Sequence, residues 1–534
     1  MGNLRKRENI FELGGDWADP ILWYARGVKA MKARKLDQRT SWTFFAAVHG
    51  IRRWMWDFYG FTAATDADPG SADTATYLDQ CQHQSWYFLP WHRGYLLALE
   101  NVIRKEIELL GGPHESWALP YWNYFATGQN MLPPAFRSAD WPDGQFDNPL
   151  FVVQRWGVMG GSNPYDISDN TNLAQMGDPT FTGPGGGGSG GFGGLETGFN
   201  WGGGKSGGIE SDPHNVVHVL VGGEDTTLFP PGTPFAGNFQ HGVMSDPLAA
   251  ALDPIFYLHH CNMDRLWESW NSFPPGKPRT APSDWQNPSN AKWLDGPASL
   301  GEREFAMPNP DGSKWVYTPA HMRDITVLGY TYDDLTPGAV APAVTVAQRI
   351  SNLGIAARAG AANAGVTVAS QEKVEMIGAN AGAVSLAGRD PVRSIIRTQP
   401  EARGRVVRSL QGARPVATVP DRVFLNLENV TGRSDATMFR VYVGGAGGAD
   451  PTGDRDYLAG SVALFGVSQA SDPAGGHAGN GITYTLEITR IVDKLHLGDN
   501  FNVDELAVFL VPAANIPEAA QVRVGRISIY RQFE

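Results

Sequence analysis

Aromatic residues are distributed very unevenly along the chain, and this distribution limits its architecture more than any other feature. All 17 tryptophans lie between Trp17 and Trp315. The 83 residues from 338 to 420 contain no Phe, Trp or Tyr and are rich in Ala, Gly and Val. Because a stretch without aromatic volume can hardly build a core, it is predicted to be a linker. The alternative is a helical hairpin lying on the main domain, since Ala and Arg favour helix.

This linker divides the 534 residues into two expected domains, because a chain of this length exceeds one compact core. Residues 1–337 are predicted to be mainly helical, with apolar stripes of helical period over 91–110 and 41–56. Residues 421–534 contain six short runs typical of strands, which predict an all-β, sandwich-like domain. The runs are 422–430, 438–443, 460–467, 482–492, 505–511 and 521–531. A glycine-rich segment, 183–208, is expected to be a flexible surface loop.

The charge and the termini exclude several classes of partner. The formal net charge is −12, so nucleic acid and anionic membranes are poor candidates. The first residues lack the apolar run of a secretion signal or membrane anchor, and a cytoplasmic location is expected. Two cysteines, Cys81 and Cys261, are too few for a disulfide framework, although one bridge between them is conceivable. The sequence leaves homo-oligomerisation open.

Six of the twelve histidines form two sets that suggest a metal centre. His214 and His218 are four residues apart, which places both rings on one face of a helix. His260 follows an apolar run about two turns into a helix that Asp253 and Pro254 are predicted to start. The structural alternatives are a solvated surface pair and a satisfied core histidine. The two sets are His49, His83 and His92 upstream, and His214, His218 and His260 downstream.

The donor chemistry of these sets favours copper. Copper stands at the top of the divalent affinity order, and neutral imidazole also suits its cuprous state. Two adjacent three-histidine sites would let two copper ions share one O2 molecule, each supplying one electron. The alternative is zinc with three histidines and an open position, as in a zinc hydrolase that uses His214 and His218.

At these residues the chain resembles the tyrosinase and polyphenol oxidase family of type 3 copper proteins. Asp253-Pro-x-Phe-Tyr-x-x-His260-x-x-x-Asp264 and the spacing of His83 and His92 carry the resemblance, which spans most of residues 40–335. It implies a helical catalytic domain built on a four-helix core that holds two copper ions. It assigns His49, His83 and His92 to copper A, and His214, His218 and His260 to copper B. His259 fits no ligand position in this pattern.

The resemblance also implies a function. The expected enzyme is a dicopper phenol oxidase that uses O2 to hydroxylate small monophenols in the ortho position and to oxidise o-diphenols to o-quinones. The alternative is an O2-binding protein similar to haemocyanin, which uses the same dicopper site. The C-terminal domain is similar to the shielding domains of latent members. The segment Tyr457-Leu458 is the expected source of a side chain that plugs the site.

Three further residues receive roles from the same resemblance. Cys81 stands where several fungal members form a thioether to the histidine equivalent to His83. The alternative is a small buried thiol. Glu210 and Asn215 resemble the pair that holds a water near the dicopper centre, where this water takes the phenol proton. The alternative for Glu210 is a charge that stabilises a helix N-terminus.

Overall fold

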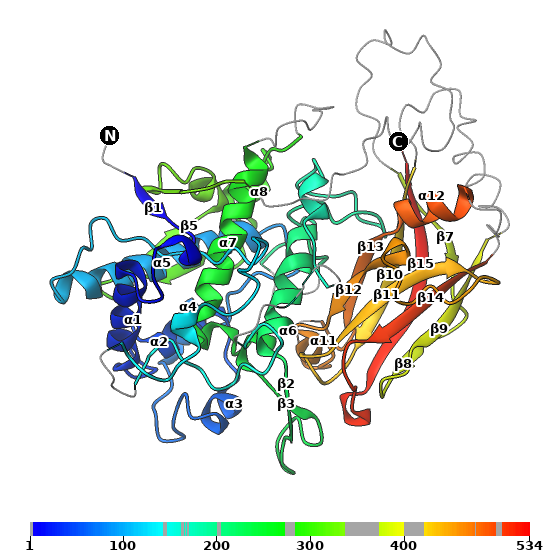
Figure 1. The fold of residues 1–534 in the computed structure, drawn as a ribbon. Helices are drawn as coiled ribbons and strands as arrows, with labels where there is room; N and C mark the ends of the chain where they lie inside the picture. Colours follow the sequence, from blue (N-terminus) through cyan, green and yellow to red (C-terminus); the bar gives the residue numbers. More distant parts are fainter. Residues whose placement is uncertain are drawn as a thin grey trace, which may run out of the picture.

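The structure is a computed structural model with a mainly helical N-terminal part and a large C-terminal β-sheet (Figure 1). It describes residues 4–142, 147–161, 165, 167, 170–199, 204–272, 284–336, 373–399, 421–475, 477–497 and 505–533. The predicted fold class, a helical domain followed by a β domain, is therefore confirmed.

The helical domain is organised around two long helices, α5 (Phe88–Leu109) and α7 (Pro254–Asn271), which pack against each other. The other helices are α1 (Asp19–Lys32), α2 (Trp42–His49), α3 (Arg53–Phe58), α4 (Ser71–Tyr77), α6 (Val216–Gly222) and α8 (Ala291–Asp295). Three two-stranded sheets lie outside them: β1 (Arg5–Arg7) with β6 (Tyr330–Tyr332), β2 (Glu224–Leu228) with β3 (Phe239–His241), and β4 (Phe305–Pro308) with β5 (Lys314–Tyr317).

Local sequence explains where the main helices begin and end. The side chain of Asp253 accepts a hydrogen bond from the Ile255 backbone N–H, and Pro254 is the first residue of α7, as predicted. Helix α5 agrees closely with the apolar stripe over 91–110. The single helix expected over 41–56 is instead divided, because the backbone is extended at Gly50 and a new helix, α3, begins at Arg53.

The described part of the C-terminal domain is built on one antiparallel sheet of nine strands in the order β12-β11-β14-β9-β7-β15-β10-β13, with β8 paired to β15. The sheet curls until its end strands meet, so that a Cβ at Gly460 of β12 would lie 3.2 Å from the Leu486 side chain of β13. The strands are β7 (Lys373–Ala379), β8 (Val384–Leu386), β9 (Val392–Thr398), β10 (Arg422–Thr431), β11 (Met438–Gly445), β12 (Leu458–Ala463), β13 (Ile482–Glu487), β14 (Glu505–Pro512) and β15 (Val522–Phe533).

Three strands of this sheet correct the expectation of a linker over 338–420. Strands β7, β8 and β9 occupy residues 373–398 and pair with strands from the end of the chain. They need no aromatic residues of their own, because Ile377, Leu386 and Ile396 are buried in a core that the other strands complete. Neither the linker nor the hairpin describes these residues. The remainder of the predicted linker, 338–372 and 400–420, lies outside the described residues.

Two of the six predicted strands are shorter than expected. The run 482–492 forms β13 only to Glu487, and its second half belongs to helix α12 (Thr489–Leu497). The run 460–467 forms β12 to Ala463, and Val467 begins the short helix α11 (Val467–Ala470). Apolar periodicity over a few residues does not separate strand from helix, which is why the sequence predicts strands throughout these two runs.

The glycine-rich segment joins the two domains rather than lying free on the surface. Gly187 has a positive φ of 102°, and a Cβ there would lie 2.4 Å from the ring of Tyr530 in β15. The Gly187 carbonyl also accepts a hydrogen bond from the Asn426 side chain of β10. The glycines thus permit a close backbone approach to the C-terminal sheet.

Among the described helices, none is both long and apolar enough to span a bilayer.

Candidate metal centre

The upstream histidines form a compact triad at the centre of the helical domain. His49 is the last residue of α2, His92 lies in the second turn of α5, and His83 lies in the loop before α5. The ring centroids are 5.6 Å apart for His49 and His83, and 5.7 Å apart for the other two pairs. Three separate segments therefore direct imidazoles to one point, as the sequence predicted.

The downstream histidines form a tighter triad. His218 lies in α6, His260 in α7, and His214 in an irregular turn before α6 that is kinked at Asp212. The three Nε2 atoms are separated by 3.1 Å (His214–His218), 3.2 Å (His214–His260) and 3.4 Å (His218–His260). Three ring nitrogens this close to one another could bind a single metal ion.

The two triads lie directly beside each other. The rings of His92 and His260 stack at a centroid distance of 4.3 Å with an interplanar angle of 13°. The ring centroids of His83 and His214 are 5.5 Å apart. One ligand set thus faces the other across a space suited to a pair of metal ions.

Hydrogen bonds at Nδ1 orient the rings. His49, His92 and His218 each place Nδ1 against a backbone carbonyl, at Pro247 (2.9 Å), Phe88 (2.8 Å) and Met244 (2.7 Å). A carbonyl only accepts, so Nδ1 carries the hydrogen in these rings and Nε2 keeps its lone pair for a metal. The same arrangement recurs in His214, whose Nδ1 is 2.8 Å from Oδ1 of Asn215.

Burial keeps these imidazoles neutral. It lowers the pKa of His49, His92, His214, His218 and His260 well below the usual value, and the neighbouring histidines lower it further. A neutral imidazole is the form that binds a metal, so the triads are ready to act as ligands at neutral pH. The donor set, six nitrogens without a carboxylate, fits copper.

Glu210 lies at the edge of the centre and is buried. Its Oε1 is 3.2 Å from His83 Nδ1 and accepts a hydrogen bond from the Gln84 backbone N–H at 2.8 Å. Its Oε2 has no hydrogen-bond partner among the described residues. Glu210 therefore orients a ring of the upstream triad and still offers one oxygen, while Asn215 orients a ring of the downstream triad.

Cys81 belongs to the upstream triad. Its Sγ is 3.0 Å from His49 Nε2 and 3.3 Å from His92 Nε2, and it lies within 4.8 Å of a ring nitrogen of His83. Burial raises the pKa of this thiol well above its usual value. The sulfur is thus within reach of all three rings.

His259 lies beside the downstream triad, although the family pattern assigns no ligand at this position. A nitrogen of His259 lies within 4.8 Å of the ligand nitrogens of the downstream triad, and its Nδ1 contacts the Tyr124 hydroxyl at 3.2 Å. Burial lowers its pKa to about 3. Its position next to His260 was the available signal, but the family pattern assigns no ligand there.

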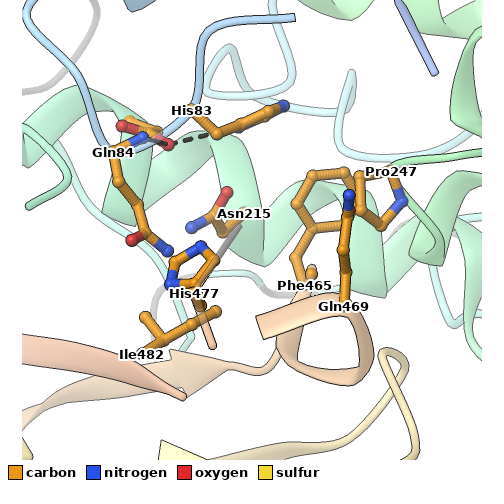
Figure 2. Close-up of a pocket in the computed structure, with 10 residues that line it drawn as sticks. His83, Gln84, Asn215, Pro247, Phe465, Gln469, His477 and Ile482 are labelled. Carbon is orange, nitrogen blue, oxygen red and sulfur yellow. Dashed lines mark hydrogen bonds and ion pairs between the residues drawn. The ribbon is translucent and has the colours of Figure 1, made fainter. Parts of the chain in front are cut away.

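A phenylalanine from the C-terminal domain covers the centre. The ring of Phe465, between β12 and α11, stacks on His218 at a centroid distance of 4.2 Å and lies 5.7 Å from His83 and His214. Figure 2 shows Phe465 in the pocket with His83, Asn215 and Pro247. The expectation that Tyr457-Leu458 supplies this side chain is wrong. Tyr457 is instead half-buried and packs against the C-terminal core, with Lys494 Nζ 4.6 Å from its ring centroid.

Comparisons with known proteins agree with this geometry. A family model described as the common central domain of tyrosinase matches residues 39–182 and 160–272, and a domain of unknown function matches residues 373–532. A curated tyrosinase of Hahella sp. (strain CCB-MM4) is 28% identical over 99% of this chain and 100% of its own length. A chloroplastic polyphenol oxidase of Malus domestica is 25% identical over 78% of this chain and 64% of its own length. The fold is similar to that of latent apple tyrosinase, with a TM-score of 0.56 and 19% identity over 99% of this chain and 97% of that one.

Proposed function

We propose that this chain, which is similar to tyrosinases and is a copper-dependent phenol oxidase, both hydroxylates monophenols and oxidises o-diphenols to o-quinones. The observation that carries the proposal is the convergence of three Nε2 atoms within 3.4 Å of one another, next to a second histidine triad. His49, His83 and His92 would hold one copper ion, and His214, His218 and His260 the other. When bound, the two ions supply O2 binding and two-electron redox chemistry.

The position of the Phe465 ring supports a binding site for the aromatic ring of a phenolic substrate. It occupies a flat space against the His218 imidazole, where a substrate ring of similar size would stack after Phe465 withdraws. Pro247 and Ile482 add apolar surface to the lining of the same pocket. The substrate class that fits is a small phenol whose hydroxyl points toward the triads.

Glu210 and Asn215 support hydroxylation of monophenols. A phenol has a pKa near 10 and must lose its proton to become a nucleophile at neutral pH. Oε2 of Glu210, which has no partner among the described residues, would hold a water that takes this proton, while Oε1 contacts His83 Nδ1. Asn215 keeps the His214 Nε2 directed at the same space.

Glu210→Gln is expected to reduce tyramine hydroxylation about a hundredfold, in the range that general-base catalysis contributes. Oxidation of catechol should fall less, so that the ratio of the two activities drops at least about tenfold, because no oxygen atom is inserted into a diphenol. Both rates are measured on protein with the same copper content. Glu304→Gln, which changes an exposed glutamate paired with Lys314, is the control. Equal losses for both substrates would contradict the proposed role.

We further propose a thioether between Cys81 and His83. Its formation replaces the S–H and one ring C–H bond by an S–C bond, and the two electrons and two protons pass to O2, which becomes H2O2. Copper-loaded protein is expected to yield a cross-linked peptide two hydrogen masses lighter than its unlinked parts. Cys81→Ser should lack this peptide. A Cys81 thiol that is fully alkylated after unfolding of the copper-loaded protein would contradict the cross-link.

We also propose that the full chain is latent. Phe465 fills the space that a substrate ring needs, and it is buried within the hydrophobic core of the helical domain. Contacts beside Phe465 hold the domains together: Arg52 donates to the Ser468 hydroxyl at 3.1 Å, and the Ser434 hydroxyl donates to Glu224 at 2.7 Å. Substrate would gain access only when this part of the C-terminal domain moves away.

A catechol assay on copper-loaded protein tests the proposed function as a whole. The expected result is O2 consumption with formation of an o-quinone, at a rate that increases when Phe465 is displaced. An O2-binding protein similar to haemocyanin would instead bind O2 reversibly without turnover, even after displacement. Zinc at both triads, or no bound metal, would also contradict the proposal.

A further inference from the structure

One short loop contacts both histidine triads. The Met244 carbonyl accepts from His218 Nδ1 at 2.7 Å, and the Pro247 carbonyl accepts from His49 Nδ1 at 2.9 Å. One ligand of each triad is therefore oriented by the loop around residues 243–248, which connects β3 to the residues before α7. A shift of this loop would turn a ring in both triads at once.

Asp246 lies between Met244 and Pro247 in the sequence, and its side chain stabilises the conformation of the loop. Its side chain accepts from the Leu248 backbone N–H at 2.8 Å, which closes a turn around Pro247. Its Oδ2 is 2.7 Å from Nε of Arg52 and 3.3 Å from His241 Nε2. The carboxylate is fully buried, and although burial alone would raise its pKa, Arg52 and His241 outweigh burial and hold the pKa below its usual range.

Arg52 contacts the same loop through both its backbone and its side chain. Its backbone N–H donates to the Leu248 carbonyl at 3.1 Å, three residues after the end of α2 at His49. Its guanidinium joins Asp246 to the C-terminal domain, with Nη2 3.1 Å from Ser468 Oγ and 3.8 Å from Asp435 Oδ2. Because this cation already lies between Asp246 and Asp435, the cluster of His241, Asp246 and Asp435 is not a further metal site.

A buried ion pair at this place needs a reason other than stability. Replacing such a pair by apolar residues is often neutral, since desolvation of the charges offsets their attraction. We infer that the pair instead fixes the orientation of the Met244 and Pro247 carbonyls. The Asp246 side chain accepts from the Leu248 backbone N–H, and the Arg52 backbone N–H donates to the Leu248 carbonyl. Ring orientation matters to a metal centre, because partners of metal-binding histidines commonly change metal affinity tenfold to a hundredfold.

We propose that Arg52 and Asp246 are positioning residues of the dicopper centre, which act by fixing the loop that orients His49 and His218. This inference rests on the proposed function, because it requires both triads to hold copper. Neither residue touches the expected substrate space. Because Arg52 also contacts Ser468 of the C-terminal domain, the positioning effect is measured as copper affinity rather than as turnover.

Copper affinity of the full chain tests this proposal. Asp246→Ala removes the turn bond and the ion pair, and Asp246→Asn keeps an oxygen for the Leu248 N–H but loses the charge. Copper release to a chelator is expected to be faster by tenfold to a hundredfold for Asp246→Ala and by a smaller factor for Asp246→Asn. If Asp246→Ala does not fold, Asp246→Asn and Arg52→Lys provide the same comparison.

The matched control is Glu100→Ala, which breaks another buried ion pair, with Arg7 (2.8 Å), away from the loop. It should lower the melting temperature without changing copper release. If the Asp246 and Arg52 variants lose melting temperature as Glu100→Ala does but release copper like the unmodified chain, the positioning role is refuted. If the unmodified chain itself fails to bind two copper ions, it is the proposed function that fails.

Discussion

Replacing His260 by alanine is expected to abolish copper binding at the downstream triad and to reduce the catechol kcat/KM at least about a thousandfold. His260 supplies one of three Nε2 atoms within 3.4 Å of one another, and its ring also stacks on His92 of the other triad. Loss of a residue that merely orients a ligand costs tenfold to a hundredfold, so loss of a ligand should cost more. Copper per chain, measured by elemental analysis, should fall below two.

His321→Ala is the control for this substitution, because His321 is exposed and caps a short turn. It should keep two copper ions and normal turnover. Activity of His260→Ala at the level of the unmodified chain, with its copper content unchanged, would contradict the assignment of this residue. A protein that retains one copper ion without activity would support it, since the reaction needs both ions.

Replacing Phe465 by alanine is expected to raise the catechol oxidase rate of the full chain at least about tenfold. The ring stacks on His218 and lies in the core of the helical domain, so it stabilises the closed arrangement. Truncation of a buried phenylalanine costs about 3–5 kcal/mol, and each 1.4 kcal/mol changes a population ratio about tenfold. Removing the ring also clears the space that the substrate needs, even if the domains stay together.

Tyr457→Ala is the matched control, because Tyr457 is an aromatic residue of the same domain that packs away from the metal centre. Its oxidase rate should stay close to that of the unmodified chain. An increase with Tyr457→Ala but not with Phe465→Ala would identify Tyr457 as the side chain that covers the centre. No increase with either variant, in protein with full copper content, would contradict latency through this contact.

The two histidine sets could be predicted from the sequence because short local patterns identify several of their residues. The four-residue spacing of His214 and His218, and the start of α7 at Asp253 and Pro254, are local features that determine which way a ring points. The structure brings each of the six histidines into the triad that was expected for it. The turn before α6 is irregular rather than helical, yet it keeps the two rings together.

The parts that the sequence did not predict depend on contacts between distant segments. Phe465 looks like any strand residue, and only the docking of the two domains makes it a cover for the centre. Strands β7–β9 carry no aromatic residues and gain their core from β10, β14 and β15. The pairing of Asp246 with Arg52, across nearly two hundred residues, has no local signature either.

Crystallographic measurement of anomalous scattering at the copper absorption edge shows whether each histidine triad holds a copper ion. The full chain, purified with copper, should show two anomalous peaks, one among His49, His83 and His92 and one among His214, His218 and His260. A single peak, or peaks outside these two triads, would contradict the account.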